Sequence, residues 1–293
     1  MKSVGTWLTT AEKRLKAAGI PSARLDSELL LARALGKTRV WLKARPEHEV
    51  PHQQLLTADS LLARRLQREP LAYIIGSKEF YGRHFSVNHD VLIPRPESEA
   101  LIGLALGCGL PKGAAIMDVG TGSGCLGITL ALELTGSRVT LLDISQTALE
   151  TAHLNAEQLG AAAAYLEADI LTLERTLDIP HAPFDLIIAN LPYVDATWEC
   201  SPETAHEPAL ALYSGANGLW HYMHLMTAAL HFLKADGRLI IEADPRQQDE
   251  LLGLADKIGY ELVVQQDLAL LFVRKQISRE LPDAPGIIKL FPR

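Results

Sequence analysis

The residues best suited to chemistry lie in the segment Phe184–Val194, whose sequence is FDLIIANLPYV. The apolar run LIIA is typical of a strand that is covered on both faces. Asn190, Leu191, Pro192 and Tyr193 follow it directly. Pro192 cannot donate to a sheet ladder and biases Leu191 toward an extended or turn conformation. A polar side chain, a backbone carbonyl and an aromatic ring therefore gather at a strand end of the kind that binds ligands in open α/β sheets. A strand that simply ends in a proline turn, with Tyr193 capping the core, is the alternative.

A glycine-rich turn forms the second candidate site. The predicted apolar strand AAIMDVG is followed by GTGSG and a predicted helix, CLGITLALELTG. The turn consists of Gly120, Thr121, Gly122, Ser123 and Gly124. Its glycines permit a tight turn and let backbone N–H groups at a helix N-terminus approach a ligand. The turn does not match the dinucleotide pattern GxGxxG and lacks a Walker lysine, so by itself it indicates a nucleotide ligand only weakly.

Two carboxylates follow the next two predicted strands. Asp143 ends the strand RVTLLDIS, about 20 residues beyond the glycines, where a carboxylate accepts hydrogen bonds from ribose hydroxyls. For Asp143 alone, a helix cap is the alternative. Asp169 ends the short strand AAAYLEADIL, where a carboxylate can receive an adenine amino group. Together with the glycine turn and the strand–helix–strand order, these positions predict a nucleoside ligand.

Three regions with different patterns predict the domain organisation. From residue 114 to about 275 strands alternate with helices, which predicts a mostly parallel, doubly wound α/β sheet. Residues 1–75 have apolar residues at helical spacing and predict a small helical bundle, with the first helix capped by Thr9 or Thr10. Alternating residues and two glycines within 71–93 predict a β-hairpin linker. The predicted domains are 1–75, 76–93 and 94–293.

Composition excludes several classes of protein. The chain has 293 residues, of which 48% are hydrophobic and 22% charged, as in ordinary globular proteins. No apolar run reaches the roughly 18 residues of a membrane span, and the first residues lack the apolar core of a signal peptide. Three cysteines are too few and too scattered for a disulfide framework or a metal knuckle. We therefore expect a cytoplasmic enzyme with no membrane partner and no metal.

The charge is unevenly distributed along the chain. Residues 1–75 hold 13 Lys and Arg against 7 Asp and Glu, which gives +6, and the remainder holds 15 against 28, which gives −13. This asymmetry suggests two modules, the basic one with an acidic or RNA-associated partner; solvated helix faces are the alternative explanation. An acidic second module disfavours a long duplex lying across it, so no stable nucleic-acid partner is expected.

The motifs together resemble a known family. DVGTGSG, Asp143 and NLPY after the fourth strand are similar to the S-adenosylmethionine-dependent methyltransferases over residues 114 to about 275. More specifically, ARLDSELLLARALG, REPLAYIIGSKEFYG and VLIPRPESEALI resemble the HemK/PrmC family, the protein-(glutamine-N5) methyltransferases of peptide chain release factors. With these segments, the resemblance extends over nearly the whole chain.

The resemblance implies a fold, a cofactor and a substrate. The fold would be a class I methyltransferase, with a Rossmann-like seven-stranded sheet after a helical recognition bundle and a hairpin. The cofactor would be S-adenosyl-L-methionine, with S-adenosyl-L-homocysteine as product. The substrate would be the glutamine of the Gly-Gly-Gln tripeptide in class I release factors, methylated by a monomer.

The resemblance also implies roles for the candidate residues. The turn from Gly120 to Gly124 would cradle the methionine part of the cofactor, and Asp143 would hold the ribose hydroxyls. Asp169 and Ile170 would lie along the adenine. Asn190 to Tyr193 would hold the glutamine amide and face the methyl group, with Asn190 also next to the cofactor. Glu207, in the loop after this segment, matches a family position that would help to shape the pocket. The scattered histidines, His181, His206, His221 and His231, are expected to be structural or on the surface.

Two departures from the family pattern keep another function open. Leu191 stands where the family usually has the first proline of Asn-Pro-Pro-Tyr, and Asn-Leu-Pro-Tyr is the form that ribosomal RNA dimethyladenosine transferases carry. Some relatives have an aromatic residue where Ile170 stands, so adenine stacking would be weaker here. The alternative function is therefore an adenine N6-methyltransferase acting on RNA or DNA, with Tyr193 stacking on an extruded base. A non-catalytic cofactor-binding protein is a third possibility.

The residue types suit transfer to an amide. An amide nitrogen is a poor nucleophile because its lone pair is delocalised into the carbonyl. Two acceptors, the Asn190 side-chain oxygen and the Leu191 backbone carbonyl, can hold both amide hydrogens and align the nitrogen with the methyl group. The Leu191 contact uses the backbone, so it does not require a proline. Tyr193 can pack flat on the amide plane. Methyl transfer from a sulfonium requires no metal.

Overall fold

A computed structural model describes residues 2–175, 178–215 and 217–275, which form two compact units. The helical unit holds the residues up to Ser77 together with Val87–His89 and Cys200–His206. The sheet unit holds the described residues of Lys78–Ser86, of Asp90–Glu199 and of the chain from Glu207 to residue 275. The predicted division at residues 75 and 93 stays a prediction, and the last residues, 276–293, lie outside the described part of the chain. No described helix is both long and apolar enough to cross a bilayer.

The helical unit contains five α-helices over its described residues: α1 (Val4–Ala17), α2 (Ala23–Leu35), α3 (Arg39–Ala44), α4 (His52–Leu66) and α5 (Leu71–Ile75). The first begins earlier than predicted, because the Ser3 side chain accepts a hydrogen bond from the backbone N–H of Thr6 and caps it. Thr9 and Thr10 lie inside the helix, where their hydroxyls donate to carbonyls one turn back. The cap predicted at Thr9 or Thr10 was therefore wrong.

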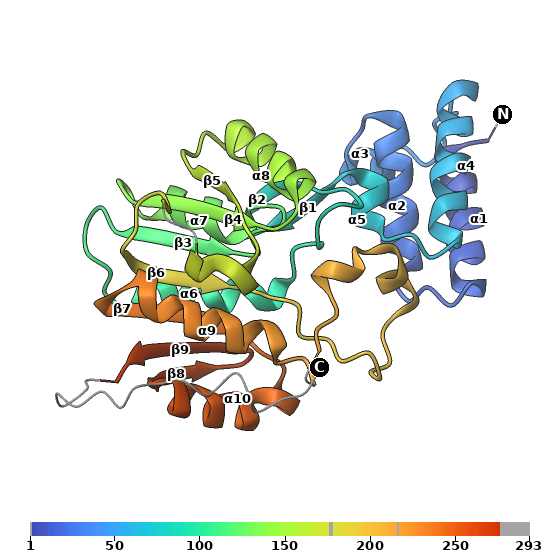
Figure 1. Cartoon of the computed structure of the whole chain (residues 1–293). Helices are drawn as coiled ribbons and strands as arrows, with labels where there is room; N and C mark the ends of the chain where they lie inside the picture. The colour runs from blue at the N-terminus through green and yellow to red at the C-terminus, as the bar shows by residue number, and fades with distance from the viewer. Residues whose placement is uncertain (1, 176–177, 216, 276–293) are drawn as a thin grey trace. The chain divides into compact units, whose positions relative to one another are not determined.

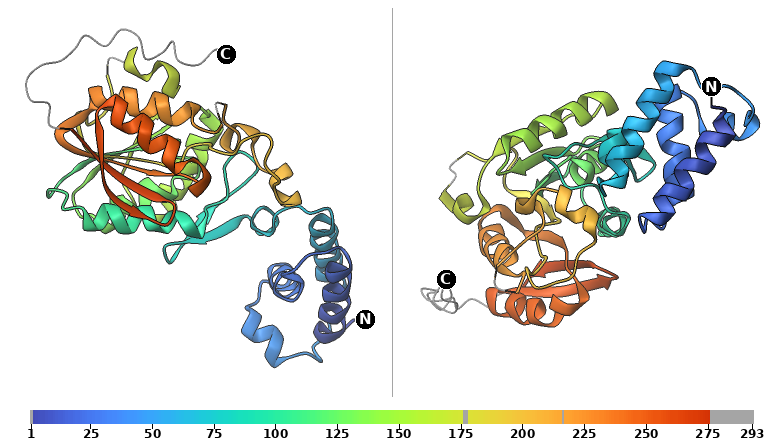
Figure 2. Two further views of the ribbon diagram at one scale, coloured as in Figure 1. Left: turned by 90° about the horizontal axis from the view of Figure 1, so that it is seen from below. Right: turned by 90° about the vertical axis from the view of Figure 1, so that its right-hand side faces the viewer.

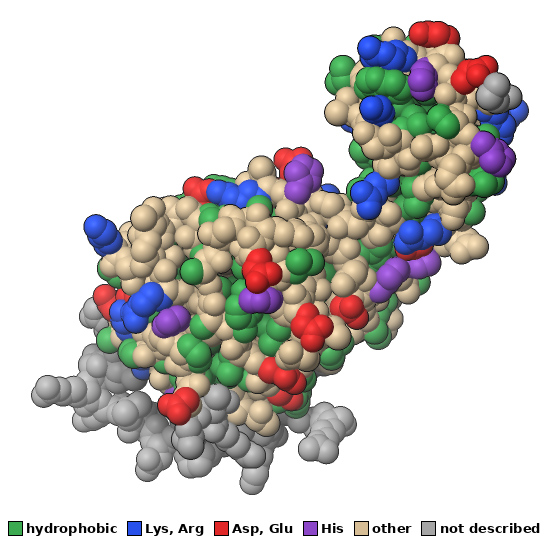
Figure 3. All heavy atoms as spheres, turned by 90° about the horizontal axis from the view of Figure 1, so that it is seen from above, with side chains coloured by type: hydrophobic (Ala, Val, Ile, Leu, Met, Phe, Trp, Pro, Cys, Tyr) green, Lys and Arg blue, Asp and Glu red, His purple; other side chains and the backbone are tan. Residues whose placement is uncertain are grey.

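Helices α1, α2 and α4 lie side by side, as the right-hand view of Figure 2 shows. Their buried apolar side chains form one core. Trp7, fully buried between them, donates its indole N–H to Asp59 at 2.7 Å. Two short helices were not predicted: α3, and α5, which replaces the start of the expected hairpin pattern. On the face drawn in Figure 3, Lys and Arg side chains of this unit are interspersed with acidic and apolar ones and form no continuous basic patch among the described residues.

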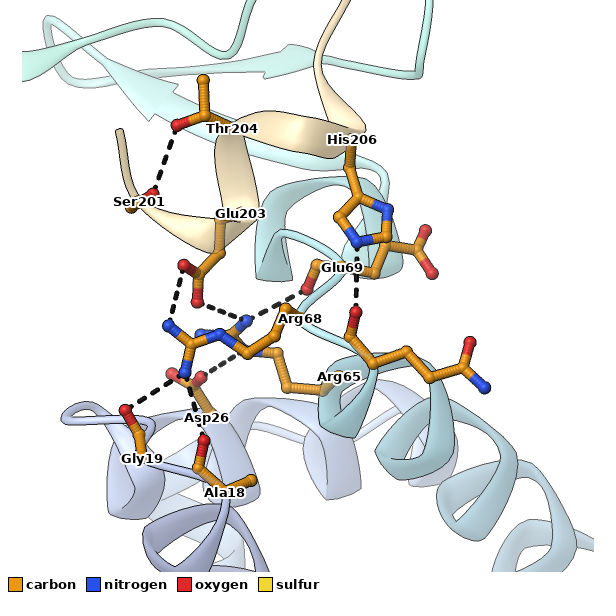
Figure 4. Close-up of polar contacts among 11 residues, drawn as sticks. Ala18, Gly19, Asp26, Arg65, Arg68, Glu69, Ser201, Glu203, Thr204 and His206 are labelled. Carbon is orange, nitrogen blue, oxygen red and sulfur yellow. Dashed lines mark hydrogen bonds and ion pairs between the residues drawn. The ribbon is translucent and has the colours of Figure 1, made fainter. Parts of the chain in front are cut away.

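A segment from far along the chain completes the helical unit. Cys200–His206 contains the short helix η3 (Pro202–His206). The Glu203 carboxylate accepts hydrogen bonds from Arg65 and Arg68, each at 3.0 Å (Figure 4). Arg65 is buried and also donates to Asp26 at 2.7 Å. Because a buried guanidinium requires such partners, this ion-pair network fixes the segment to the helices.

The sheet unit contains a seven-stranded sheet in the order β5-β4-β3-β6-β7-β9-β8. Its strands are β3 (Ala115–Val119), β4 (Arg138–Asp143), β5 (Ala164–Glu167), β6 (Phe184–Ala189), β7 (Leu233–Glu242), β8 (Tyr260–Gln266) and β9 (Ala269–Arg274). Neighbours from β5 to β7 pair in parallel, and β9 pairs antiparallel with both β7 and β8. The predicted doubly wound fold is confirmed, and the winding direction reverses at β3, next to β6.

Helices cover both faces of the sheet (Figure 1). One core contains side chains of α6 (Glu99–Gly107), α7 (Cys125–Glu133) and α8 (Gln146–Leu159). The other contains side chains of α9 (Trp220–Phe232) and α10 (Pro245–Ile258). Because β3 and β6 are buried along their whole length, both are apolar in sequence apart from one buried aspartate each, Asp118 and Asp185.

Three short helices each contribute at least one residue to the lining of the candidate site. They are the 3₁₀ helices η1 (Pro96–Ser98), η2 (Ile170–Arg175) and η4 (Ala209–Ala211). The predicted hairpin is formed by β1 (Ser77–Phe80) and β2 (Arg83–Ser86). Phe80 and Phe85 from this hairpin are buried in the same core as α6, α7 and α8, so the hairpin packs as part of the sheet unit.

Candidate active site

A cleft lies at the carboxyl ends of β3, β4 and β6, within the sheet unit. Its lining includes most of the predicted site residues: Gly120, Thr121, Gly122, Ser123, Asp143, Asp169, Ile170, Asn190, Leu191 and Pro192. Gly124 and Tyr193 do not belong to this lining. The fold therefore places the glycine turn, the two carboxylates and the segment after β6 around one cavity.

Hydrogen bonds to Asp118, the aspartate of DVG, hold the glycine turn in place. One oxygen of its carboxylate accepts hydrogen bonds from the Thr121 hydroxyl at 2.6 Å and from the Gly127 N–H at 2.9 Å. Burial raises the pKa of Asp118 to about 6. Gly124 has a structural role, because its φ is +82° and a Cβ there would lie 2.5 Å from the Ile128 side chain. The structure thus adds Asp118 to the predicted set and places Gly124 against the helix.

Asp143 links the end of β4 to the glycine turn. Its carboxylate accepts hydrogen bonds from the Gly122 N–H at 2.8 Å and from the Ser145 N–H at 3.0 Å. Burial raises its pKa. Capping of the next helix belongs to Ser145, whose hydroxyl accepts from the Ala148 N–H. Since a carboxylate offers about four lone-pair positions, Asp143 retains acceptor capacity for ribose hydroxyls.

Apolar side chains form the outer wall of the cleft. Ile144 and Leu210 both line it, and they are 47% and 60% exposed. Ile170 lines it too, and the neighbouring Asp169 carboxylate accepts from the Leu171 N–H at 2.9 Å. Exposed large apolar side chains beside carboxylate acceptors suit a flat heterocycle that carries hydrogen-bond donors. The residues present therefore fit a nucleoside.

Asn190 is oriented by two residues that sequence reasoning missed. Its side-chain Nδ2 donates to the Ser98 hydroxyl oxygen at 2.9 Å. The Ser98 hydroxyl in turn donates to the Glu242 carboxylate at 2.6 Å. Both Ser98 and Glu242 are 1% exposed, and burial raises the pKa of Glu242. The available signals were a serine within the PRPES junction and a glutamate ending the apolar run LIIE.

The Leu191 side chain fits against the glycine turn. It is buried, and a Cβ on Gly120 would lie 2.8 Å from its Cδ2 atom. The Leu191 carbonyl oxygen lies 3.3 Å from the Tyr222 hydroxyl, which also donates to the Glu242 carbonyl at a shorter distance. A hydroxyl has one proton and a carbonyl oxygen has two lone pairs. The Leu191 carbonyl therefore retains acceptor capacity for a ligand.

Tyr193 is anchored to the protein at both ends. Its hydroxyl donates to Glu242 at 3.2 Å, and burial raises its pKa. Its carbonyl accepts from the Gln247 side chain at 2.7 Å, and the same amide group donates to the Asn217 carbonyl at 2.6 Å. These contacts fix the end of the turn after β6. Packing of the Tyr193 ring against a substrate amide stays a prediction.

The loop after this turn is anchored by Glu207. Its carboxylate accepts from the Arg95 guanidinium at 2.6 Å and from the Ile93 N–H at 3.2 Å, and Arg95 itself lines the cleft. His221 was expected to be structural or on the surface, yet it lines the cleft as well, with its Nδ1 atom 2.8 Å from the Ser214 hydroxyl. Among the described residues no group of three or more His, Cys, Asp or Glu is arranged to hold a metal.

Two family models match the chain. The PrmC N-terminal domain matches residues 6–76, and a methyltransferase domain matches residues 110–268, which is more than half of the chain. The first match falls on the helical unit, and the second falls on the sheet unit except for Cys200–His206, which belongs to the helical unit.

Curated relatives of the chain are named as methyltransferases. The chain is 36% identical to a release factor glutamine methyltransferase of Geobacter sulfurreducens, over 84% of this chain and 86% of that protein. It is 39% identical to one of Koribacter versatilis, over 80% and 86%. It is also 33% identical to a bifunctional methyltransferase of Rickettsia bellii over 91% of this chain, and spans about half (53%) of that longer protein.

Solved structures confirm the fold. A 16S rRNA methyltransferase from T. thermophilus, solved with AdoMet and guanosine, aligns with a TM-score of 0.50 and 18% identity, over 68% of this chain and 50% of its own. A methyltransferase from Pyrococcus furiosus aligns with a TM-score of 0.50 and 16% identity, over 74% and 100%. With the sequence matches, these findings establish that the chain is a class I S-adenosylmethionine-dependent methyltransferase and belongs to the family of release factor glutamine methyltransferases.

Proposed function

We propose that this chain transfers the methyl group of S-adenosylmethionine to the side-chain amide nitrogen of the glutamine in the Gly-Gly-Gln motif of class I release factors. The main support is the pair of acceptors at the end of β6. Because Asn190 gives its Nδ2 to Ser98, its Oδ1 is left to accept, next to the Leu191 carbonyl. Two acceptors match the two hydrogens of a primary amide.

The residues on the other side of the cleft suit the cofactor. Gly120 and Gly122 have φ values of +69° and +53°, so they bring backbone rather than side chains to the cavity. Asp143 has acceptor capacity for the ribose, and Ile144 and Leu210 offer apolar surface for the adenine. When bound, S-adenosylmethionine supplies an electrophilic methyl group on a sulfonium.

The protein's part in the reaction is to orient and polarise the amide. Hydrogen bonds to Asn190 Oδ1 and the Leu191 carbonyl fix both amide hydrogens, which aligns the nitrogen lone pair with the methyl carbon. The same acceptors stabilise positive charge as it develops on nitrogen, more than they stabilise the neutral planar amide. The cofactor, held by the glycine turn and Asp143, would supply the methyl group and keep the carbon–sulfur electron pair as the nitrogen–carbon bond forms, and the nitrogen would then release one proton to water.

Methylation of adenine N6 is the second candidate because Leu191 gives the turn the form Asn-Leu-Pro-Tyr. An exocyclic amine also carries two hydrogens that this pair of acceptors can hold. The relatives do not favour it, since several that match at least 80% of this chain and of their own length are named release factor glutamine methyltransferases. The net charge of −13 beyond residue 75 also disfavours a nucleic-acid substrate.

A labelled transfer assay distinguishes the two functions. The full chain is incubated with S-adenosylmethionine carrying a tritiated methyl group, together with either a purified class I release factor or ribosomal RNA. We expect label only in the release factor, mapped by mass spectrometry to the glutamine of Gly-Gly-Gln. A release factor with that glutamine changed to asparagine is the matched control. Label in the RNA and none in the release factor would overturn the proposed function.

A further inference from the structure

The shape of the Asn190 amide does not determine its orientation. An asparagine side chain has an oxygen and an NH2 group of nearly equal size, so packing alone does not decide which of them faces a ligand. For the proposed reaction the oxygen must face the cleft, because a primary amide brings hydrogen-bond donors. If the NH2 group faced the cleft, it would oppose the donors of glutamine and suit the acceptors of a carboxylate.

A buried relay behind Asn190 decides its orientation. Burial raises the pKa of Glu242. Hydrogen bonds from the side chains of Ser98, Tyr193 and Asn190 act against burial and lower this pKa, which favours the ionised carboxylate. An ionised Glu242 is only an acceptor, so the Ser98 hydroxyl must use its single proton toward Glu242, 2.6 Å away. The Ser98 oxygen can then only accept, and it accepts from Asn190 Nδ2 at 2.9 Å. The second oxygen of Glu242 accepts from the Tyr193 hydroxyl at 3.2 Å. Each hydrogen bond in this chain of contacts therefore has a single direction from donor to acceptor.

Taking the proposed function as given, we infer that Glu242 and Ser98 are positioning residues that set the amide orientation of Asn190 and so make the enzyme select glutamine over glutamate. Neither side chain belongs to the group that touches the substrate amide; they act through Asn190. Glu242 ends β7, Ser98 ends η1 and Asn190 follows β6, so three separate elements must be in place for the selection to work. Because the relay is buried, water does not compete for its hydrogen bonds.

Replacing Glu242 by glutamine should reverse the relay. A glutamine here has two orientations. In one, its oxygen accepts from Ser98, and its NH2 group faces the Tyr193 hydroxyl, which loses its acceptor. In the other, its NH2 group donates to Ser98 and its oxygen still accepts from Tyr193, so every group keeps a partner. The second is favoured, and it makes the Ser98 hydroxyl donate to Asn190, which turns its NH2 group toward the cleft.

The test compares glutamine and glutamate as ligands of the full chain. A class I release factor serves as substrate, and the same factor with glutamate in place of the Gly-Gly-Gln glutamine serves as competitive inhibitor. For Glu242→Gln we expect kcat to fall about 100-fold. We also expect the inhibition constant of the glutamate factor, divided by KM of the glutamine factor, to fall at least about tenfold. Affinity for S-adenosylhomocysteine, measured by calorimetry, should stay unchanged.

Two further variants keep the test decisive. Ser98→Ala removes the relay without reversing it, so its ratio should lie between those of the wild type and Glu242→Gln, and it replaces that variant if the latter does not fold. Asp185→Asn is the matched control: Asp185 is buried in the sheet unit and binds the Ala115 N–H and Lys234, at the opposite end of β6. It should leave the ratio unchanged.

The outcomes separate this inference from the proposed function. If the wild type methylates the release factor and the ratio stays constant in both Glu242→Gln and Ser98→Ala, the two residues do not orient Asn190 and the inference is overturned, even if kcat falls. A fall in the ratio confined to these two variants supports it. If the wild type does not methylate the release factor at all, the proposed function itself fails.

Discussion

The two walls of the cleft are built in different ways. The wall that we propose holds the cofactor, here called the cofactor wall, follows β3 and β4 and consists largely of glycines and backbone N–H groups, which Asp118 and Asp143 hold in place. The wall that we propose holds the glutamine, here called the substrate wall, follows β6 and is a turn held by side chains of remote segments: Ser98 from before α6, and Glu242 and Gln247 from β7 and α10. On the proposed function, a local motif binds a cofactor that many proteins share, whereas a long-range network orients the group that binds the selected side chain.

The largest effect is expected where the substrate wall touches the substrate. Asn190→Ala removes one of two acceptors at the developing charge, so kcat/KM for the release factor should fall about 10²–10³-fold. Affinity for S-adenosylhomocysteine should remain near that of the wild type, as calorimetry can check. A variant that turns over near the wild-type rate would show that the substrate wall does not act through this amide.

Asp118, in the cofactor wall, should make the free energy of unfolding depend on pH. Its pKa is raised from 3.8 to about 6 by burial. Between these values the native state keeps a proton that the unfolded state has lost, so the free energy of unfolding falls as pH rises, by up to about 3 kcal/mol. Below this window Asp118 is protonated in both states and the loss is absent.

Asp118→Asn isolates this contribution. The amide keeps an acceptor for Thr121 and Gly127 but carries no charge. The free energy of unfolding of the variant minus that of the wild type should therefore increase by up to about 3 kcal/mol as pH rises from 3.8 to about 6. Urea titrations across this range measure the difference. A difference independent of pH would mean that the turn does not rest on a buried carboxyl of raised pKa.

A smaller effect is expected from Asp143→Ala. The change removes an acceptor for the ribose and releases the N–H groups of Gly122 and Ser145. The dissociation constant of S-adenosylhomocysteine should rise about 10–100-fold, as for the loss of a hydrogen bond to a charged group. Asp195→Ala, at an exposed carboxylate that binds only Thr197 among the described residues, is the control and should not change it. Equal affinities in all three proteins would contradict the role of Asp143.

The smallest expected effect tests whether the two walls contact each other through Gly120 and Leu191. Gly120→Ala places a Cβ 2.8 Å from the Leu191 side chain and strains a residue whose φ is +69°. In a Leu191→Ala background the clash disappears while the strain remains. A double-mutant cycle should therefore show a favourable coupling of about 1 kcal/mol in the free energy of unfolding. Strictly additive variants would mean that Leu191 adjusts freely and that the walls are independent.

The same contrast explains what could be predicted from the sequence. The glycine turn and Asp143 were predicted because their partners are close in the chain, so that motif and spacing carry the geometry. Asn190 was predicted from its position after an apolar strand. Ser98 and Glu242 were missed because they lie 92 and 52 residues from Asn190, and only the order of strands in the sheet brings them together.

Local features of the sequence also limited what could be predicted of the helical unit. The first turn after the true cap, Ser3, contains Gly5, a poor helix former, so the threonines further on looked like the start of the helix. Helix α3 spans only 6 residues, too short for apolar periodicity to predict it.

The proposed reaction requires the cofactor and the amide to meet between the two walls, which a crystal structure of the full chain with S-adenosylhomocysteine tests most directly. We expect the product on the turn from Gly120 to Ser123, with its ribose hydroxyls on Asp143 and its sulfur toward Asn190. Product bound at any other place, or bound with its sulfur directed away from Asn190, would contradict the account.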